Sequence, residues 1–139
     1  MRIVLDTNAL VSGILTPYGT CGEIVRSLTS GVLGLCVDSR ILFEYEDVLL
    51  RPDFGFDRGM VMALLEYIGD SAIVYNAPPL PLTLADPDDN AFLELAAAAH
   101  ADCLVTGNMK HFPMQKRQGV GVLSPAQFVE ALRKAQKRL

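Results

Sequence analysis

Short apolar runs alternate along this chain with longer segments whose apolar residues recur every three or four positions. The short runs predict buried strands at 2–5, 33–37, 71–75, 102–106 and 120–123. The longer segments predict helices at 9–15, 20–30, 40–50, 58–68, 91–100 and from 125 onward. Strands that alternate with helices form parallel sheets covered on both faces. We therefore expect an α/β fold, a single Rossmann-like domain over residues 1–139 with three layers and a central parallel sheet of about five strands.

Capping signals support several of the predicted helix starts. Thr20 to Glu23 and Ser124 to Gln127 each have the spacing of a capping box, in which two side chains satisfy two free backbone N–H groups. Asp57 and Ser39 are the expected N-caps of the helices that follow them. Three prolines within 76–84 predict an extended connection that cannot be helical.

Composition excludes several classes of protein. Half of the residues are hydrophobic and 20% are charged, as in a globular domain rather than a disordered chain. No apolar run approaches the roughly 20 residues that a membrane span needs, and no signal peptide precedes the first strand. The three cysteines are widely spaced within apolar segments, which is typical of buried thiols in a reducing compartment. We expect a cytoplasmic protein that makes no membrane contact.

Charge is unevenly distributed along the chain. Residues 1–109 hold five Lys and Arg against 15 Asp and Glu, whereas residues 110–139 hold seven Lys and Arg against one acid. This segregation permits an acidic cluster that holds cations beside a basic surface that attracts polyanions. A basic helix end that complements the helix dipole explains the second half equally well.

Acidic side chains gather where strands end and helices begin. Asp6 directly follows the first strand, the position where open α/β sheets bind ligands. Taken alone, Asp6 is better explained as the N-cap of the next helix. However, Asp86, Asp88 and Asp89 crowd a single helix start, and one cap satisfies one helix. Carboxylates this close repel one another, so the surplus indicates a bound cation.

Two further positions bear on such a site. Glu44 and Glu46 flank the apolar stripe of their predicted helix on opposite edges, and periodicity does not decide between them. Asn108 follows the fourth predicted strand. Because parallel strands end at the same edge of a sheet, Asp6, the 86–89 turn and Asn108 share one rim if their strands are neighbours.

Four blocks of sequence, in this order and spacing, resemble the PIN domain family. The similarity is greatest to the branch of toxin components of toxin–antitoxin systems that is related to VapC-like ribonucleases, and it covers nearly the whole chain. The blocks are Asp6-Thr7-Asn8, residues 44–52, residues 86–90, and residues 104–108 followed by His111-Phe112-Pro113.

The resemblance implies a metal-dependent endoribonuclease whose acidic residues bind Mg²⁺ or Mn²⁺. By position these residues are Asp6, Glu44 and Asp89, with Asp86 close enough to assist. The family often has an acid where this chain has Asn108. An amide oxygen can bind Mg²⁺ but adds no charge, so a second metal site would be weaker. The absence of a Cys/His cluster also favours Mg²⁺ or Mn²⁺ over zinc.

Supporting roles and partners follow from the same resemblance. Thr7, Asn8 and Thr106 are expected to orient the carboxylates, and roles as turn and cap residues are equally consistent with them. The loop of Lys110, His111 and Phe112 is a candidate nucleic-acid contact, with a cation for phosphate and a ring for a base. The implied partners are an RNA substrate, single-stranded or looped, a small antitoxin protein and a second copy of the chain in a homodimer.

Two other functions remain open at this point. Asn108 in place of an acid is compatible with a non-catalytic PIN-like module that binds RNA or protein. A carboxylate-dependent phosphatase is disfavoured, since the first strand ends in Asp-Thr-Asn rather than Asp-x-Asp. A dinucleotide enzyme is disfavoured because no GxGxxG follows the first strand.

Overall fold

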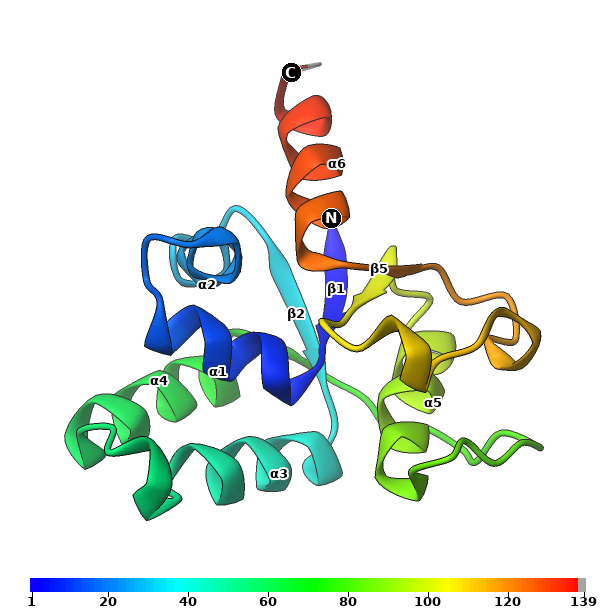
Figure 1. The fold of residues 1–139 in the computed structure, drawn as a ribbon, viewed down its shortest axis with the longest axis horizontal. Coiled ribbons are helices and arrows are strands. Elements are labelled where there is room, and N and C mark those ends of the chain that lie inside the picture. The colour runs from blue at the N-terminus through cyan, green and yellow to red at the C-terminus, as the bar shows by residue number, and fades with distance from the viewer. Residues whose placement is uncertain (138–139) are drawn as a thin grey trace.

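The computed structural model describes residues 1–137, so residues 138–139 of the predicted domain lie outside the described part of the chain. Strands and helices alternate as predicted (Figure 1). The strands are β1 (Arg2–Leu5), β2 (Gly34–Val37), β3 (Ile73–Val74), β4 (Cys103–Val105) and β5 (Val122–Leu123). The α-helices are α1 (Thr7–Leu15), α2 (Thr20–Thr29), α3 (Ser39–Leu49), α4 (Arg58–Ser71), α5 (Asn90–Ala98) and α6 (Pro125–Lys137). Short 3₁₀ turns span Pro52–Phe54 (η1), Pro87–Asp89 (η2), Met109–His111 (η3) and Met114–Lys116 (η4).

The five strands form one parallel sheet in the order β3-β2-β1-β4-β5, which confirms the predicted fold class. The central strand β1 pairs with β2 on one side and with β4 on the other, with Leu5 opposite Val105. The carboxyl ends of β1 and β4 therefore lie side by side, as the shared rim requires. The third strand is shorter than predicted because α4 continues to Ser71.

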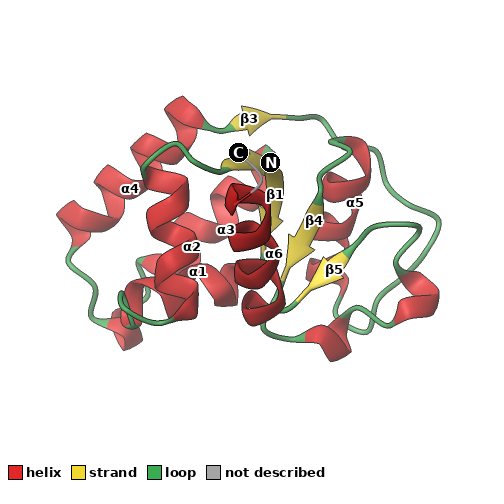
Figure 2. Cartoon of the chain, turned by 90° about the horizontal axis from the view of Figure 1, so that it is seen from above, coloured by secondary structure: helices red, strands yellow, loops and turns green. Residues whose placement is uncertain are grey.

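Helices cover both faces of this sheet. Figure 2 shows β4 between α5 and α6, so these two helices lie on opposite faces. Helix α2 contacts α1 and α6, whereas α3 contacts α4 and α5. The Ala-rich helix α5 contacts β1, β2 and β4, and its residues 92–96 are all buried, as its nearly continuous apolar sequence predicts. Within residues 1–137, no helix combines the length and the apolar character that crossing a bilayer requires.

The helix caps agree with the predictions in part. Ser124 and Gln127 form the predicted capping box, with distances of 3.2 and 2.9 Å, and Asp57 caps α4 by accepting from the Met60 N–H. Two predictions were wrong by one residue. Gly19, not Thr20, is the N-cap of α2, and the carboxylate of Asp38, not the hydroxyl of Ser39, caps α3.

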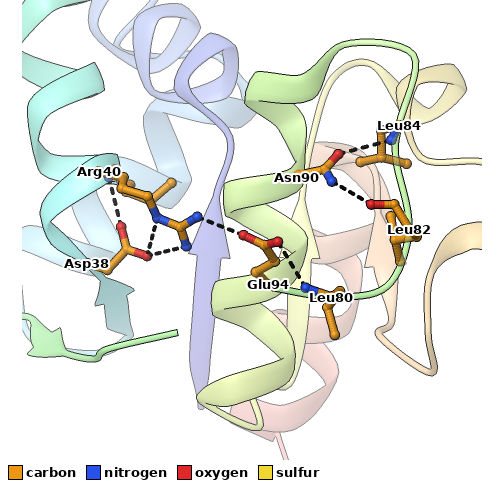
Figure 3. A network of polar contacts seen from close by, with 8 residues as sticks. Asp38, Arg40, Leu80, Leu82, Leu84, Asn90 and Glu94 are labelled. Carbon is orange, nitrogen blue, oxygen red and sulfur yellow. Dashed lines mark hydrogen bonds and ion pairs between the residues drawn. The ribbon is translucent and has the colours of Figure 1, made fainter. Parts of the chain in front are cut away.

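A buried polar network fastens the proline-rich connection to α5 (Figure 3). Glu94 accepts a hydrogen bond from the Leu80 N–H at 3.0 Å, and one turn earlier Asn90 accepts from the Leu84 N–H, also at 3.0 Å. Arg40 joins the other oxygen of Glu94, at 2.7 Å, to the α3 cap Asp38, at 2.8 Å. This network fixes the chain just before the acidic turn η2, and it joins the start of α3 to α5.

Candidate metal-binding site

Asp6 lies at the carboxyl end of the central strand, with its side chain turned toward β4. Its N–H donates to the Val105 carbonyl at 2.9 Å, and its carboxylate accepts from the Thr106 hydroxyl at 2.6 Å. The residue is 4% exposed. Asp6 occupies the N-cap position of α1, yet its side chain makes no capping hydrogen bond. A capping role alone therefore does not account for this carboxylate, which also binds the Thr106 hydroxyl beyond β4.

Helix α3 brings Glu44 to the same strand end. The Thr7 hydroxyl donates to Glu44 Oε2 at 2.5 Å, so the residue next to Asp6 holds the second carboxylate. Glu46 is exposed. Of the two glutamates that periodicity left undecided, only Glu44 lies beside the strand end that carries Asp6.

The turn η2 contributes the third carboxylate. Asp89 is 8% exposed, and its Oδ2 atom is buried without a hydrogen bond of good geometry, although His111 Nδ1 lies 3.1 Å away. A buried carboxylate oxygen that lacks a hydrogen bond is costly unless a cation completes its environment. Asp86 is exposed and caps η2 by accepting from the Asp88 N–H at 3.0 Å.

The environment raises the pKa of all three carboxyl groups. Burial raises the pKa of Asp6 above its ordinary value, against the hydrogen bond from Thr106 and the nearby N–H groups of Thr7 and Asn8, which lower it. Burial also raises the pKa of Glu44, and repulsion from Asp6 adds to the rise.

Asp89 shows the largest of these effects. Burial and repulsion from Asp6 and Asp86 raise its pKa from 3.8 to about 6, although the neighbouring His111 opposes the rise. Asp6 thus repels both Glu44 and Asp89. Three acids from three separate segments are thus linked electrostatically through Asp6.

The residues at this rim fit a hard divalent cation. They offer carboxylate oxygens, one of them without a hydrogen bond, and hard oxygen donors are what Mg²⁺ and Mn²⁺ prefer. Within residues 1–137, no three His, Cys, Asp or Glu side chains are grouped closely enough to hold a metal ion together. Mg²⁺ does not require such a cage, because it keeps several of its water ligands.

The predicted supporting residues lie at the ends of β1 and β4, and they differ in how they contact the acids. The hydroxyls of Thr7 and Thr106 each hold one carboxylate. Asn108 follows Thr106 closely, and its N–H donates to the Thr106 hydroxyl at 3.0 Å. Asn8 is exposed at the start of α1, where its backbone N–H acts on Asp6.

The predicted nucleic-acid loop needs a correction. Phe112 is fully buried in the core, so its ring cannot stack on a base. The turn η3 directs this ring inward, where it buries a large apolar area. His111 lies against Asp89, within the acidic site, and Lys110 remains exposed.

Sequence reasoning missed the buried residues behind the site. Tyr45 was expected only as part of the apolar stripe of α3, but its hydroxyl donates to the Leu5 carbonyl at 2.5 Å. Glu94 was not noticed at all, although it is 6% exposed and paired with Arg40. A charged residue inside an almost wholly apolar helix was the available signal, because such residues are rarely buried without a partner.

Comparison with protein families matches residues 2–110 to the PIN domain family. The chain belongs to this family. The matched region includes every acid of the candidate site and ends just beyond Asn108. A comparison with curated proteins gives no match.

Among solved structures, the PIN domain described here is similar to a chain of the crystal structure of VapBC2 from Rickettsia felis bound to a DNA fragment from their promoter. The TM-score is 0.59 at 15% sequence identity, over 89% of this chain and 98% of the other. At this identity the similarity concerns the fold, and it agrees with the parallel sheet and flanking helices of this PIN domain.

Proposed function

We propose that this PIN domain is a Mg²⁺- or Mn²⁺-dependent endoribonuclease that hydrolyses RNA phosphodiester bonds. The observation that carries the proposal is the buried Asp89 carboxylate, whose Oδ2 atom faces His111 Nδ1 at 3.1 Å and whose pKa is raised to about 6 by burial and by the charges of Asp6 and Asp86. Asp6, Glu44 and Asp89 would hold the ion, with Asp86 and Asn108 at the edge of the site. A bound divalent ion would neutralise charge on the phosphate and activate a water molecule.

The roles of the protein groups follow from their contacts. Thr106 holds the Asp6 carboxylate and Thr7 holds that of Glu44, so neither acid is free to rotate away from the rim. Metal ligands fixed by such hydrogen bonds bind more tightly than free ones. Asp6 is central, because it follows the middle strand β1 and its charge acts on both of the other acids.

The test compares Asp6→Asn with Glu46→Gln, which removes an exposed acid from the same region. In the wild-type protein Mn²⁺ should raise the melting temperature, because an ion at ~100 times its Kd stabilises the folded state by about 2.7 kcal/mol. Asp6→Asn should lose both this rise and metal-dependent RNA cleavage, whereas Glu46→Gln should keep both. An Asp6→Asn protein that still cuts RNA with Mn²⁺ would count against the assignment.

One observation favours a second function. Asn108 supplies no charge, which suits a PIN-like module that binds RNA or protein without cleaving it. Calorimetry separates the two functions, since the non-catalytic module would show no Mg²⁺ or Mn²⁺ site of millimolar affinity or better. Hydrolysis of a small phosphoester, with no action on RNA, would instead support a phosphatase.

We further propose that the protein is the toxin of a toxin–antitoxin pair. Support comes from the fold similarity to a chain of VapBC2 from Rickettsia felis, a complex that is bound to a DNA fragment from its promoter. The protein would act in the cytoplasm as a homodimer, and a small antitoxin would bind it. Co-purification with the product of an adjacent small gene tests the antitoxin, and light scattering in solution tests the dimer.

A further inference from the structure

Tyr45 connects the helix that carries Glu44 to the strand that carries Asp6. Its side chain is fully buried on α3, and its hydroxyl donates to the carbonyl of Leu5, the last residue of β1. Buried tyrosine hydroxyls need a hydrogen-bond partner, and here the partner is the backbone of the central strand.

The Leu5 carbonyl bonds to the Tyr45 hydroxyl rather than to a neighbouring strand. The pairs between β1 and β2 are Arg2 with Gly34 and Ile3 with Leu35, and among residues 1–137 no backbone N–H outside the strands and helices donates to the Leu5 carbonyl. Leu5 is 1% exposed, so water does not replace a strand partner for its carbonyl. A buried backbone carbonyl is normally paired, and the Tyr45 hydroxyl provides that pairing.

Two neighbouring residues of α3 therefore bind the residues that come directly before and after Asp6 in the sequence. Tyr45 binds Leu5, the residue before Asp6, and Glu44 accepts from Thr7, the residue after it. On its other side, Asp6 is fixed to β4 through the Val105 carbonyl. The separation between the Asp6 and Glu44 carboxylates thus depends on how α3 packs against the end of β1.

We propose that Tyr45 is a positioning residue of the metal site, which fixes the spacing of Asp6 and Glu44 through its hydrogen bond to the Leu5 carbonyl. The inference rests on the proposed function, because it assigns Tyr45 a role in that same site. Tyr45 itself contacts neither the ion nor the substrate. Removal of its hydroxyl would weaken the packing of α3 on β1 and make the separation of the two carboxylates less well fixed.

The test is Tyr45→Phe, with Tyr67→Phe as a matched control. Tyr67, on α4, also donates its hydroxyl to a backbone carbonyl, that of Leu28, at 3.2 Å, but it contacts none of the acids. Mn²⁺ affinity is measured by calorimetry, alongside the melting temperature of each metal-free protein. Residues that orient metal ligands typically change metal affinity ~10–100-fold, so Tyr45→Phe should weaken Mn²⁺ binding by ~10-fold or more. Tyr67→Phe should bind Mn²⁺ as the wild type does, within about a factor of two.

A kinetic measurement adds a second readout. If Tyr45 acts by positioning, a large excess of Mn²⁺ should restore much of the RNA cleavage by Tyr45→Phe, because the defect lies in holding the ion. A lower melting temperature with unchanged Mn²⁺ affinity would overturn the proposal and leave Tyr45 a structural residue. A wild-type protein that binds no Mn²⁺ would refute the proposed function, and the role of Tyr45 with it.

A measurement on the native protein covers the case in which Tyr45→Phe does not fold. The buried, hydrogen-bonded hydroxyl proton of Tyr45 should be visible by NMR and should shift when Mg²⁺ is added, whereas the signals of Tyr67 should not move. An unchanged Tyr45 signal at saturating Mg²⁺ would overturn the proposal.

Discussion

Without metal, the protein should become more stable as the pH falls from 7 to 5. Burial and the carboxylates of Asp6 and Asp86 raise the pKa of Asp89 from 3.8 to about 6, so the folded state binds this proton more tightly than the unfolded state does. Stability falls with rising pH wherever the folded state holds more protons. The cost of ionising Asp89 is thus absent well below pH 4, grows between pH 4 and 6, and is complete above pH 6.

The expected magnitude follows from the raised pKa. At 1.36 kcal/mol per pKa unit, the full cost of the ionised Asp89 carboxylate is about 3 kcal/mol. Lowering the pH from 7 to 5 should recover about 1.3 kcal/mol of this cost. For a chain of 139 residues, this corresponds to a rise in melting temperature of about 4 °C. The raised pKa values of Asp6 and Glu44 act in the same direction.

The assay is urea unfolding of the wild type and of Asp89→Asn between pH 5 and 7.5, with EDTA present. The difference between the two proteins reports Asp89 together with its interactions with Asp6, Asp86 and His111, because groups that do not interact with Asp89 titrate alike in both. At pH 7 the variant should be the more stable by up to about 3 kcal/mol, and the difference should shrink toward pH 4. Saturating Mn²⁺ should reverse the order. The reasoning fails if, with EDTA, Asp89→Asn is no more stable than the wild type at pH 7.

Two further predictions concern the fold. Glu94→Gln removes the charge that pairs with the half-exposed Arg40, and it should lower the free energy of unfolding in urea by about 1–3 kcal/mol. The control Glu130→Gln removes an exposed ion pair and should lower it by less than about 0.5 kcal/mol. Similar losses of stability in both variants would refute the role of the buried network. Gly22→Ala should cost about 1–3 kcal/mol, because the added methyl group would overlap the Pro17 carbonyl where α1 and α2 meet. In the control Gly69→Ala, on α4, the added methyl group meets no atom within 4 Å, and the free energy of unfolding should rise by up to about 1 kcal/mol. A Gly22→Ala protein as stable as the wild type would contradict the close approach of Gly22 to the Pro17 carbonyl.

The alternation of apolar runs was sufficient to predict the parallel sheet, because strands buried on both faces are short and continuously apolar. It was also sufficient to place Asp6 and Thr106 at strand ends. The adjacency of those strands was not predictable, since strand order depends on packing between distant segments. The structure supplies it by pairing Leu5 with Val105.

Errors arose where two neighbouring residues could do the same task. Asp38 and Ser39 are both good N-caps, and the structure uses the carboxylate, which also pairs with Arg40. Phe112 lies in a polar, basic stretch, and local sequence suggested a surface ring. The Phe112 ring is instead buried in the core, because removing an aromatic ring from water stabilises the fold more than leaving it exposed on a surface loop would.

The aspartates at helix starts provide an internal comparison that bears on the acidic site. Asp38, Asp57 and Asp86 each use a carboxylate oxygen to accept from a backbone N–H of the turn they begin. Asp6 and Asp89 occupy equivalent N-cap positions, yet neither makes such a bond. Both are buried instead, and the charge of Asp6 raises the pKa of Asp89. A capping role accounts for the first three aspartates, but it gives no reason for burying the other two carboxylates within each other's electrostatic influence. A divalent cation between them gives such a reason, since it would convert their repulsion into binding energy.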